Sequence, residues 1–148
     1  MTEAQSVAAA VGAGMYARDR AAQVCGIALD AIEPGGAVCR MTVREDMVQG
    51  HGTCHGGIVF TLADTAFAYA CNAYNRVTVA LNAEIAFLAP AHTGEVLTAT
   101  AHERSRSGRT GVYDVEVRNA AGTLVALFRG ASYETRGEVV PLPGPDRP

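Results

Sequence analysis

The chain has 148 residues and a formal net charge of −3, with 49% hydrophobic and 18% charged residues. This length and composition fit a single domain of an ordinary soluble globular protein. The small net charge gives no reason to expect nucleic acid or an anionic membrane surface as a partner. The start of the chain lacks a basic segment followed by an apolar core, so we expect no signal peptide and a cytoplasmic location.

Two further features exclude function classes. The longest apolar run, residues 58–73, contains Asp64 and Asn72 and is therefore too polar for a membrane span. The cysteines lack the paired spacing of a disulfide framework or a four-cysteine zinc site, so we interpret them as small buried hydrophobic residues. They are Cys25, Cys39, Cys54 and Cys71.

The first half of the chain predicts one helix and two strands. An alanine-rich helix is expected over residues 3–20, followed by a strand over residues 24–33. Pro34-Gly35-Gly36 forms the turn into a second strand, residues 37–44, whose alternating apolar and polar side chains are typical of a half-buried sheet. The glycine-containing segment 47–54 predicts a loop.

One long helix is predicted over residues 56–73, where apolar side chains recur every three or four residues. At 1.5 Å per residue this helix is roughly 27 Å long, enough to lie across a whole sheet. Beyond it, the sequence predicts four strands: residues 76–88, 95–105, 109–119 and 123–135. The proline-rich tail, residues 137–148, is predicted to be disordered.

These elements predict an α+β fold in which a curved antiparallel sheet wraps around one long central helix. A sheet face and an apolar helix stripe bury each other in such a fold. Residues 1–136 are expected to form one domain. Because the helix is apolar on more than one side, we expect part of it to face a second protomer.

The start of the central helix combines features that suit chemistry on a carbonyl group. Gly56 and Gly57 allow a ligand to approach the backbone closely, and the free N–H groups of a first helical turn suit a developing oxyanion. Asp64 lies two turns further along among apolar neighbours. Desolvation raises the pKa of such a carboxylate and makes it a better base or nucleophile.

The spacing of these residues favours a site shared by two chains. Asp64 is eight residues from Gly56, which corresponds to about 12 Å along a helix axis. The side chain leans back toward the N-terminus and recovers only part of that gap. A carbonyl bound at Gly56 would therefore lie beyond the reach of the same chain's Asp64. Two such helices packed antiparallel would bring each Asp64 toward the Gly56 of the other chain.

Four segments resemble the hotdog thioesterases, and among them the phenylacetyl-coenzyme A thioesterase group. They are His55-Gly56-Gly57, residues 60–68, residues 108–114 and residues 125–130. The resemblance implies the hotdog fold and hydrolysis of an aromatic acyl-coenzyme A such as phenylacetyl- or hydroxyphenylacetyl-coenzyme A. It also implies that no cofactor or metal is needed, and that paired dimers form a tetramer.

The resemblance further implies roles for single residues. Asp64 is the general base for water, or a nucleophile that forms a transient anhydride, and the Gly56 N–H polarises the thioester carbonyl. Gln49 lies near the carbonyl or the water, although many phenylacetyl-type members have asparagine there, and His55 shapes the same pocket. The residues implied to bind the substrate or its coenzyme A arm are Gly57, Thr65, Ser107, Gly108 and Arg109.

Other interpretations stay open for some residues. A metal site at His51, Cys54 and His55 lacks a convincing fourth ligand, and adjacent cysteine and histidine residues seldom orient as nucleophile and base. Three arginines form either a phosphate site or a solvated hairpin end: Arg104, Arg106 and Arg109.

Two rival functions share the predicted fold. A non-catalytic acyl-coenzyme A sensor is expected to lack the carboxylate or to carry a DNA-binding extension. A hydratase needs a His/Asp pair over the acyl β-carbon. The presence of Asp64 within an intact thioesterase-type motif favours hydrolysis over both.

Overall fold

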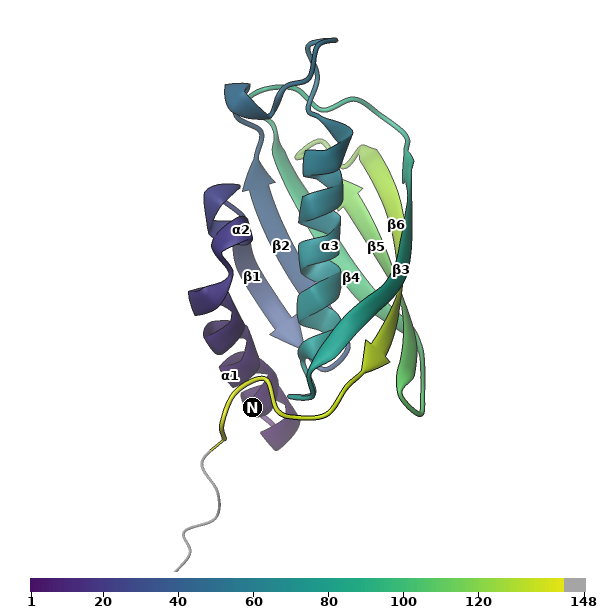
Figure 1. Cartoon of the computed structure of the whole chain (residues 1–148). Coiled ribbons are helices and arrows are strands. Elements are labelled where there is room, and N and C mark those ends of the chain that lie inside the picture. Colours follow the sequence, from purple (N-terminus) through teal and green to yellow (C-terminus); the bar gives the residue numbers. More distant parts are fainter. Residues whose placement is uncertain (143–148) are drawn as a thin grey trace, which may run out of the picture.

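The computed structural model describes residues 1–142 and contains one six-stranded sheet with a long helix packed against it (Figure 1). The helices are α1 (Glu3–Arg18), α2 (Arg20–Val24) and α3 (Gly56–Asn72), with a 3-10 turn η1 (Glu45–Met47) before α3. The strands are β1 (Ala28–Glu33), β2 (Gly36–Thr42), β3 (Thr78–Phe87), β4 (Val96–Ser107), β5 (Thr110–Arg118) and β6 (Leu124–Glu134). Over the described range, every helix is too short or too polar to cross a membrane.

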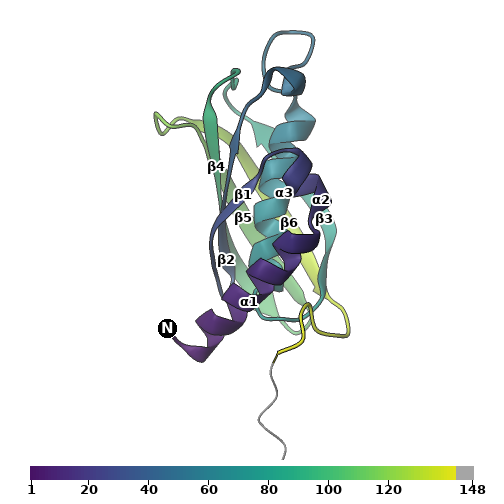
Figure 2. The ribbon, with the colours of Figure 1, turned by 90° about the vertical axis from the view of Figure 1, so that its left-hand side faces the viewer.

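The strands lie in the order β1-β2-β4-β5-β6-β3, and every neighbouring pair is antiparallel. The sheet curves around α3, which confirms the predicted α+β hotdog arrangement (Figure 1). Helix α1 packs against β1, and in Figure 2 α1 and α2 lie on the side that faces the viewer. Among residues 1–142 neither edge strand, β1 or β3, has another strand beyond it, but β1 packs against α1.

Helix α3 buries its apolar face on the inner face of the sheet. The Phe67 ring packs edge-on against Tyr113, with the ring centroids 5.6 Å apart. The Phe67 ring also packs onto Gly130 of β6. Glycine permits this contact, since a Cβ at position 130 would lie 2.8 Å from the ring. The cysteine interpretation is confirmed for three of the four residues, because Cys25 is only half-buried. The fully buried apolar residues of α3 include Leu62, Ala63, Ala66 and Ala70.

The predicted bounds of α3 are correct to within one residue, but the segment before β1 differs from the prediction. Instead of one helix to residue 20 and a strand from residue 24, a second short helix follows α1, and β1 begins only at Ala28. Asp19 causes the difference. It ends α1, and its carboxylate accepts the Ala22 N–H at 3.1 Å, which starts α2.

The tail also differs from the prediction over residues 137–142. Val140 is only 8% exposed, and its N–H and carbonyl both bond the Asn75 side-chain amide at 3.0 Å. The Gly137 carbonyl accepts the Val77 N–H at 3.1 Å. In Figure 1 this segment passes below α3 toward α1. The rest of the predicted disordered tail, residues 143–148, lies outside the described residues.

Candidate active site

The first turn of α3 leaves one backbone donor free. The His55 ring accepts the Gly57 N–H at its Nδ1, at 2.9 Å, and so caps the helix. The His55 carbonyl accepts the N–H groups of Ile58 and Val59 at 2.9 and 3.2 Å. The Gly56 N–H has no acceptor among residues 1–142. Of the two glycines predicted at the site, Gly56 is therefore the one with an available N–H, and the N–H of Gly57 is bonded to the His55 ring.

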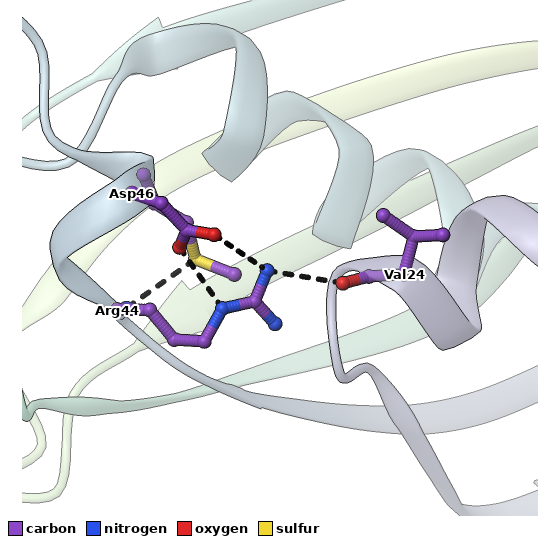
Figure 3. Close-up of polar contacts among 4 residues, drawn as sticks. Val24, Arg44 and Asp46 are labelled. Atoms are coloured by element: carbon purple, nitrogen blue, oxygen red, sulfur yellow. Dashed lines mark hydrogen bonds and ion pairs between the residues drawn. The ribbon is translucent and has the colours of Figure 1, made fainter.

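Arg44 makes polar contacts with the end of α2 and with η1 (Figure 3). Its guanidinium donates to the Val24 carbonyl at the end of α2, at 3.0 Å, and to the Asp46 carboxylate in η1, also at 3.0 Å. The guanidinium lowers the pKa of the Asp46 carboxyl. One residue further along, the Met47 carbonyl accepts the His55 N–H at 2.8 Å. The end of α2, η1 and the start of α3 are thus joined through consecutive polar contacts.

Gln49 lies beside the helix start, but its side chain is occupied within its own loop. Its amide nitrogen donates to the Thr53 hydroxyl at 2.7 Å, and its amide oxygen accepts the His51 N–H. The Gln49 backbone N–H also donates to the Thr53 carbonyl, at 2.9 Å. These contacts use one of the two amide N–H groups and one acceptor site of the amide oxygen, so the predicted contact with a carbonyl or a water needs neither partner to be released.

A cavity of about 390 Å³ opens beside Gly56, with Gln49 and Cys54 also in its lining. Most of the residues that line it are apolar, and two large ones are more than half exposed: Phe87 at 56% and Leu88 at 52%. Neither residue is among those that the sequence predicts at the site. In the sequence, the only sign that these two residues belong to the site is that they form an apolar pair at the end of a predicted strand.

Asp64 lies on the open stripe of α3, away from that cavity lining. The other residues of this stripe are small: Gly57, Thr61 and Ala68. Within residues 1–142 the Asp64 carboxylate has no hydrogen bond or ion pair, and burial raises its pKa. In a single chain, the carboxylate and the free N–H are therefore both available but lie apart on one straight helix.

Thr65, predicted to bind substrate, is buried on α3. Its hydroxyl donates to the Thr61 carbonyl one turn earlier, at 2.6 Å. The Thr61 hydroxyl in turn donates to the Gly57 carbonyl at 2.9 Å. Both hydroxyl hydrogens are used by the helix backbone, so neither hydroxyl is left as a donor to a substrate.

The predicted coenzyme A residues 107–109 form the turn between β4 and β5. Gly108 has a φ of 58°, which favours glycine at this position. The preceding Arg106 lies over the Tyr74 ring at 3.7 Å, which places the hairpin at the C-terminal end of α3, opposite to Gly56. Arg109 is exposed and forms no ion pair within the described range, whereas Arg104 pairs with Asp114 at 3.4 Å.

A larger groove, about 520 Å³, lies on the outer face of the sheet, but neither Gly56 nor Asp64 lines it. Its centre holds an ion pair between Arg129 and Asp114 at 2.6 Å, and Arg129 lowers the pKa of Asp114. No residue of the predicted site lines it, so the candidate site is the cavity beside Gly56. Across residues 1–142, no three His, Cys, Asp or Glu side chains are grouped to hold a metal ion.

Known proteins show the same combination of sequence and fold. A profile of the thioesterase superfamily matches residues 51–126. The acyl-coenzyme A thioesterase PaaI of Escherichia coli is 47% identical over 125 residues, covering 84% of this chain and 89% of that protein. Human acyl-coenzyme A thioesterase 13 is 32% identical over 106 residues, covering 70% of this chain and 76% of that protein.

Two solved structures agree with these sequence matches. The E. coli PaaI structure has a TM-score of 0.89 at 45% identity, covering 90% of this chain and 97% of that chain. A mutant of the phenylacetic acid degradation protein PaaI from Thermus thermophilus has a TM-score of 0.76 at 38% identity, covering 79% of this chain and 100% of that chain. The chain therefore belongs to the thioesterase superfamily, as a thioester hydrolase with the hotdog fold.

Proposed function

We propose that the chain hydrolyses an aromatic acyl-coenzyme A, such as phenylacetyl- or hydroxyphenylacetyl-coenzyme A, to the free acid and coenzyme A. The observation that carries this proposal is the Gly56 N–H, which has no acceptor among residues 1–142 and lies beside a cavity lined mostly by apolar side chains. The likeness to E. coli PaaI, whose structure is described as that of a protein from the phenylacetic acid degradation operon, supports the substrate class.

In the proposed reaction Asp64 is the general base. It takes a proton from a water molecule as the water oxygen attacks the thioester carbonyl carbon. The Gly56 N–H donates to the resulting oxyanion, and such a donor is worth most where charge develops in the transition state. When the C–S bond breaks, the coenzyme A thiolate leaves and receives the proton from Asp64. Direct attack by the Asp64 carboxylate, giving an anhydride that water then opens, is the alternative route.

The geometry of one chain favours a site completed by a second copy. The open edge strand β3 is ten residues long and carries exposed Val79 and Leu81. Unpaired strand edges of this kind pair readily with another chain. Antiparallel pairing of two β3 strands would continue the sheet and place two α3 helices side by side. The small residues beside Asp64 would let the helices approach, so that Asp64 reaches the partner's Gly56.

The same arrangement gives the β4–β5 hairpin a role. In an antiparallel pair, the C-terminal end of one α3 lies beside the N-terminal end of the other. Residues 107–109 of one protomer would then lie near the partner's Gly56, where the coenzyme A arm leaves the site. Gly57 and Thr65 would shape the surface beside it. A tetramer of such dimers and a cytoplasmic location stay predictions.

A panel of acyl-coenzyme A thioesters tests the proposal. We expect free thiol to be released from phenylacetyl-coenzyme A faster than from short- and long-chain thioesters. Asp64→Ala should lose most of the rate while still binding substrate. Equal turnover by Asp64→Ala and the unmodified protein would overturn the role of Asp64. Binding without thiol release from any thioester would favour the sensor, and hydration of an enoyl thioester without thiol release would favour the hydratase.

A further inference from the structure

The Phe87 ring is packed against Gly56, the residue that carries the free N–H donor of the site. Phe87 pairs with Ala126 on β6, which is fully buried, so the Phe87 side chain points to the inner face of the sheet. A Cβ built on Gly56 would lie 3.0 to 3.4 Å from three atoms of the ring. The ring therefore occupies the space that a side chain at position 56 would fill.

The ring is both held in place and open to a ligand. The N–H groups of Leu88 and Ala89 both donate to the Val125 carbonyl, at 2.8 and 3.2 Å, which fixes the end of β3. Yet 56% of Phe87 is exposed, and Phe87 lines the cavity beside Gly56. Apolar surface left open inside a pocket next to a few polar groups is typical of ligand sites.

We infer that Phe87 determines the acyl selectivity of this site, by presenting its ring to the acyl group while the thioester carbonyl bonds the Gly56 N–H. This inference rests on the proposed function. Most other side chains that line this cavity are apolar, among them Val59, Leu88 and Val125, and Gln49 and Thr53 are the polar ones. An aromatic acyl group suits such a wall. The coenzyme A arm carries amide groups that need hydrogen-bond partners and so fits it poorly.

Substitutions at Phe87 test the inference through a ratio of rates. The ratio is kcat/KM for phenylacetyl-coenzyme A divided by kcat/KM for hexanoyl-coenzyme A. In Phe87→Leu, which keeps apolar surface but removes the ring, we expect this ratio to fall by about threefold to tenfold, the size of an aromatic pair interaction. Phe87→Tyr keeps the ring and should keep the ratio. Because more than half of Phe87 is exposed, both variants should fold.

Leu81→Ala is the matched control for an indirect effect through the strand edge. Leu81 lies on the same strand, is 58% exposed and does not line the cavity. We expect it to leave the ratio unchanged. The same ratio in Phe87→Leu and the unmodified protein would overturn the inference, as would an equal change in Leu81→Ala. Absence of thiol release by the unmodified protein would instead refute the proposed hydrolysis itself, and the inference with it.

Discussion

At the start of α3, one side chain decides which backbone donor is available for chemistry. The His55 ring turns back to accept the Gly57 N–H, and the His55 carbonyl takes the next two N–H groups. Gly56 is left with its donor directed away from the helix and with no Cβ to cover it. The proposed oxyanion contact thus depends on the position of Gly56 in the turn and on the hydrogen atom of its amide.

Replacing Gly56 separates these two properties. Gly56→Pro removes the N–H and suits the first helical position, and His55, at φ −58° and ψ 132°, already has the conformation required before proline. We expect kcat/KM to fall by about 100- to 1,000-fold. Gly56→Ala keeps the N–H while adding a Cβ that also meets the Phe87 ring, so it is the matched control and should lose much less. Similar losses in both variants would contradict the role of the N–H.

The pKa of Asp64 predicts opposite effects of one substitution on activity and stability. Burial raises this pKa above its ordinary value of 3.8, so the ionised carboxylate is disfavoured in the folded chain. The destabilisation is fully present above the folded pKa and absent below the unfolded pKa. Asp64→Asn should therefore abolish activity but raise Tm at neutral pH.

Thermal unfolding measured against pH checks this prediction. The gain in Tm of Asp64→Asn should shrink as the pH falls toward 3.8. Over the same range kcat/KM of the unmodified protein should fall, because the base becomes protonated. A Tm difference that does not change with pH would show that Asp64 carries no such burial effect.

Among the elements, the C-terminal segment shows how a distant contact orders part of the chain. Asn75 has a φ of 62°, and its amide bonds both backbone groups of Val140. Val140 in turn lies against Gly14 of α1, where any side chain would collide with it. The last described residues therefore join α1 to the loop after α3.

Substituting Asn75 tests this connection. Asn75→Ala removes two buried hydrogen bonds and places alanine in a left-handed backbone conformation that it disfavours. We therefore expect the free energy of unfolding to fall by about 2–3 kcal/mol. Asn75→Gly loses the same bonds without the backbone strain and should fall by roughly 1–2 kcal/mol. Urea unfolding measures both changes. An unchanged midpoint for Asn75→Ala would mean that the segment does not contribute to stability.

The long helix and most strands are predictable at this scale because their periodicity is local. Helix α3 begins at the glycine pair and ends within one residue of the expected position. Four features depend on contacts that periodicity does not show. Asp19 caps both the end of α1 and the start of α2. Val140 is buried by residues far away in the sequence, and the amide of Gln49 is bonded within its own loop. Phe87 meets Gly56 only through the register of β3 on β6.

For the whole molecule, the separation of Asp64 and Gly56 matters most. They are eight residues apart on one unbroken helix, a rise of about 12 Å, and Asp64 does not line the cavity beside Gly56. The sequence predicts this separation, and the α3 bounds agree with it. An open β3 edge and a stripe of small residues on α3 supply the surfaces through which a second copy could bring the two groups together.

Complementation between inactive variants tests the shared site most directly. Asp64→Asn and Gly56→Pro chains would be produced in one cell with different affinity tags and purified through both tags. In a two-fold symmetric dimer with shared sites, one of the two sites in each mixed pair keeps both its Asp64 and its Gly56. We predict that the mixed protein recovers on the order of a quarter to a half of the unmodified rate per protomer. A mixed protein no more active than either variant alone would contradict a site built from two chains.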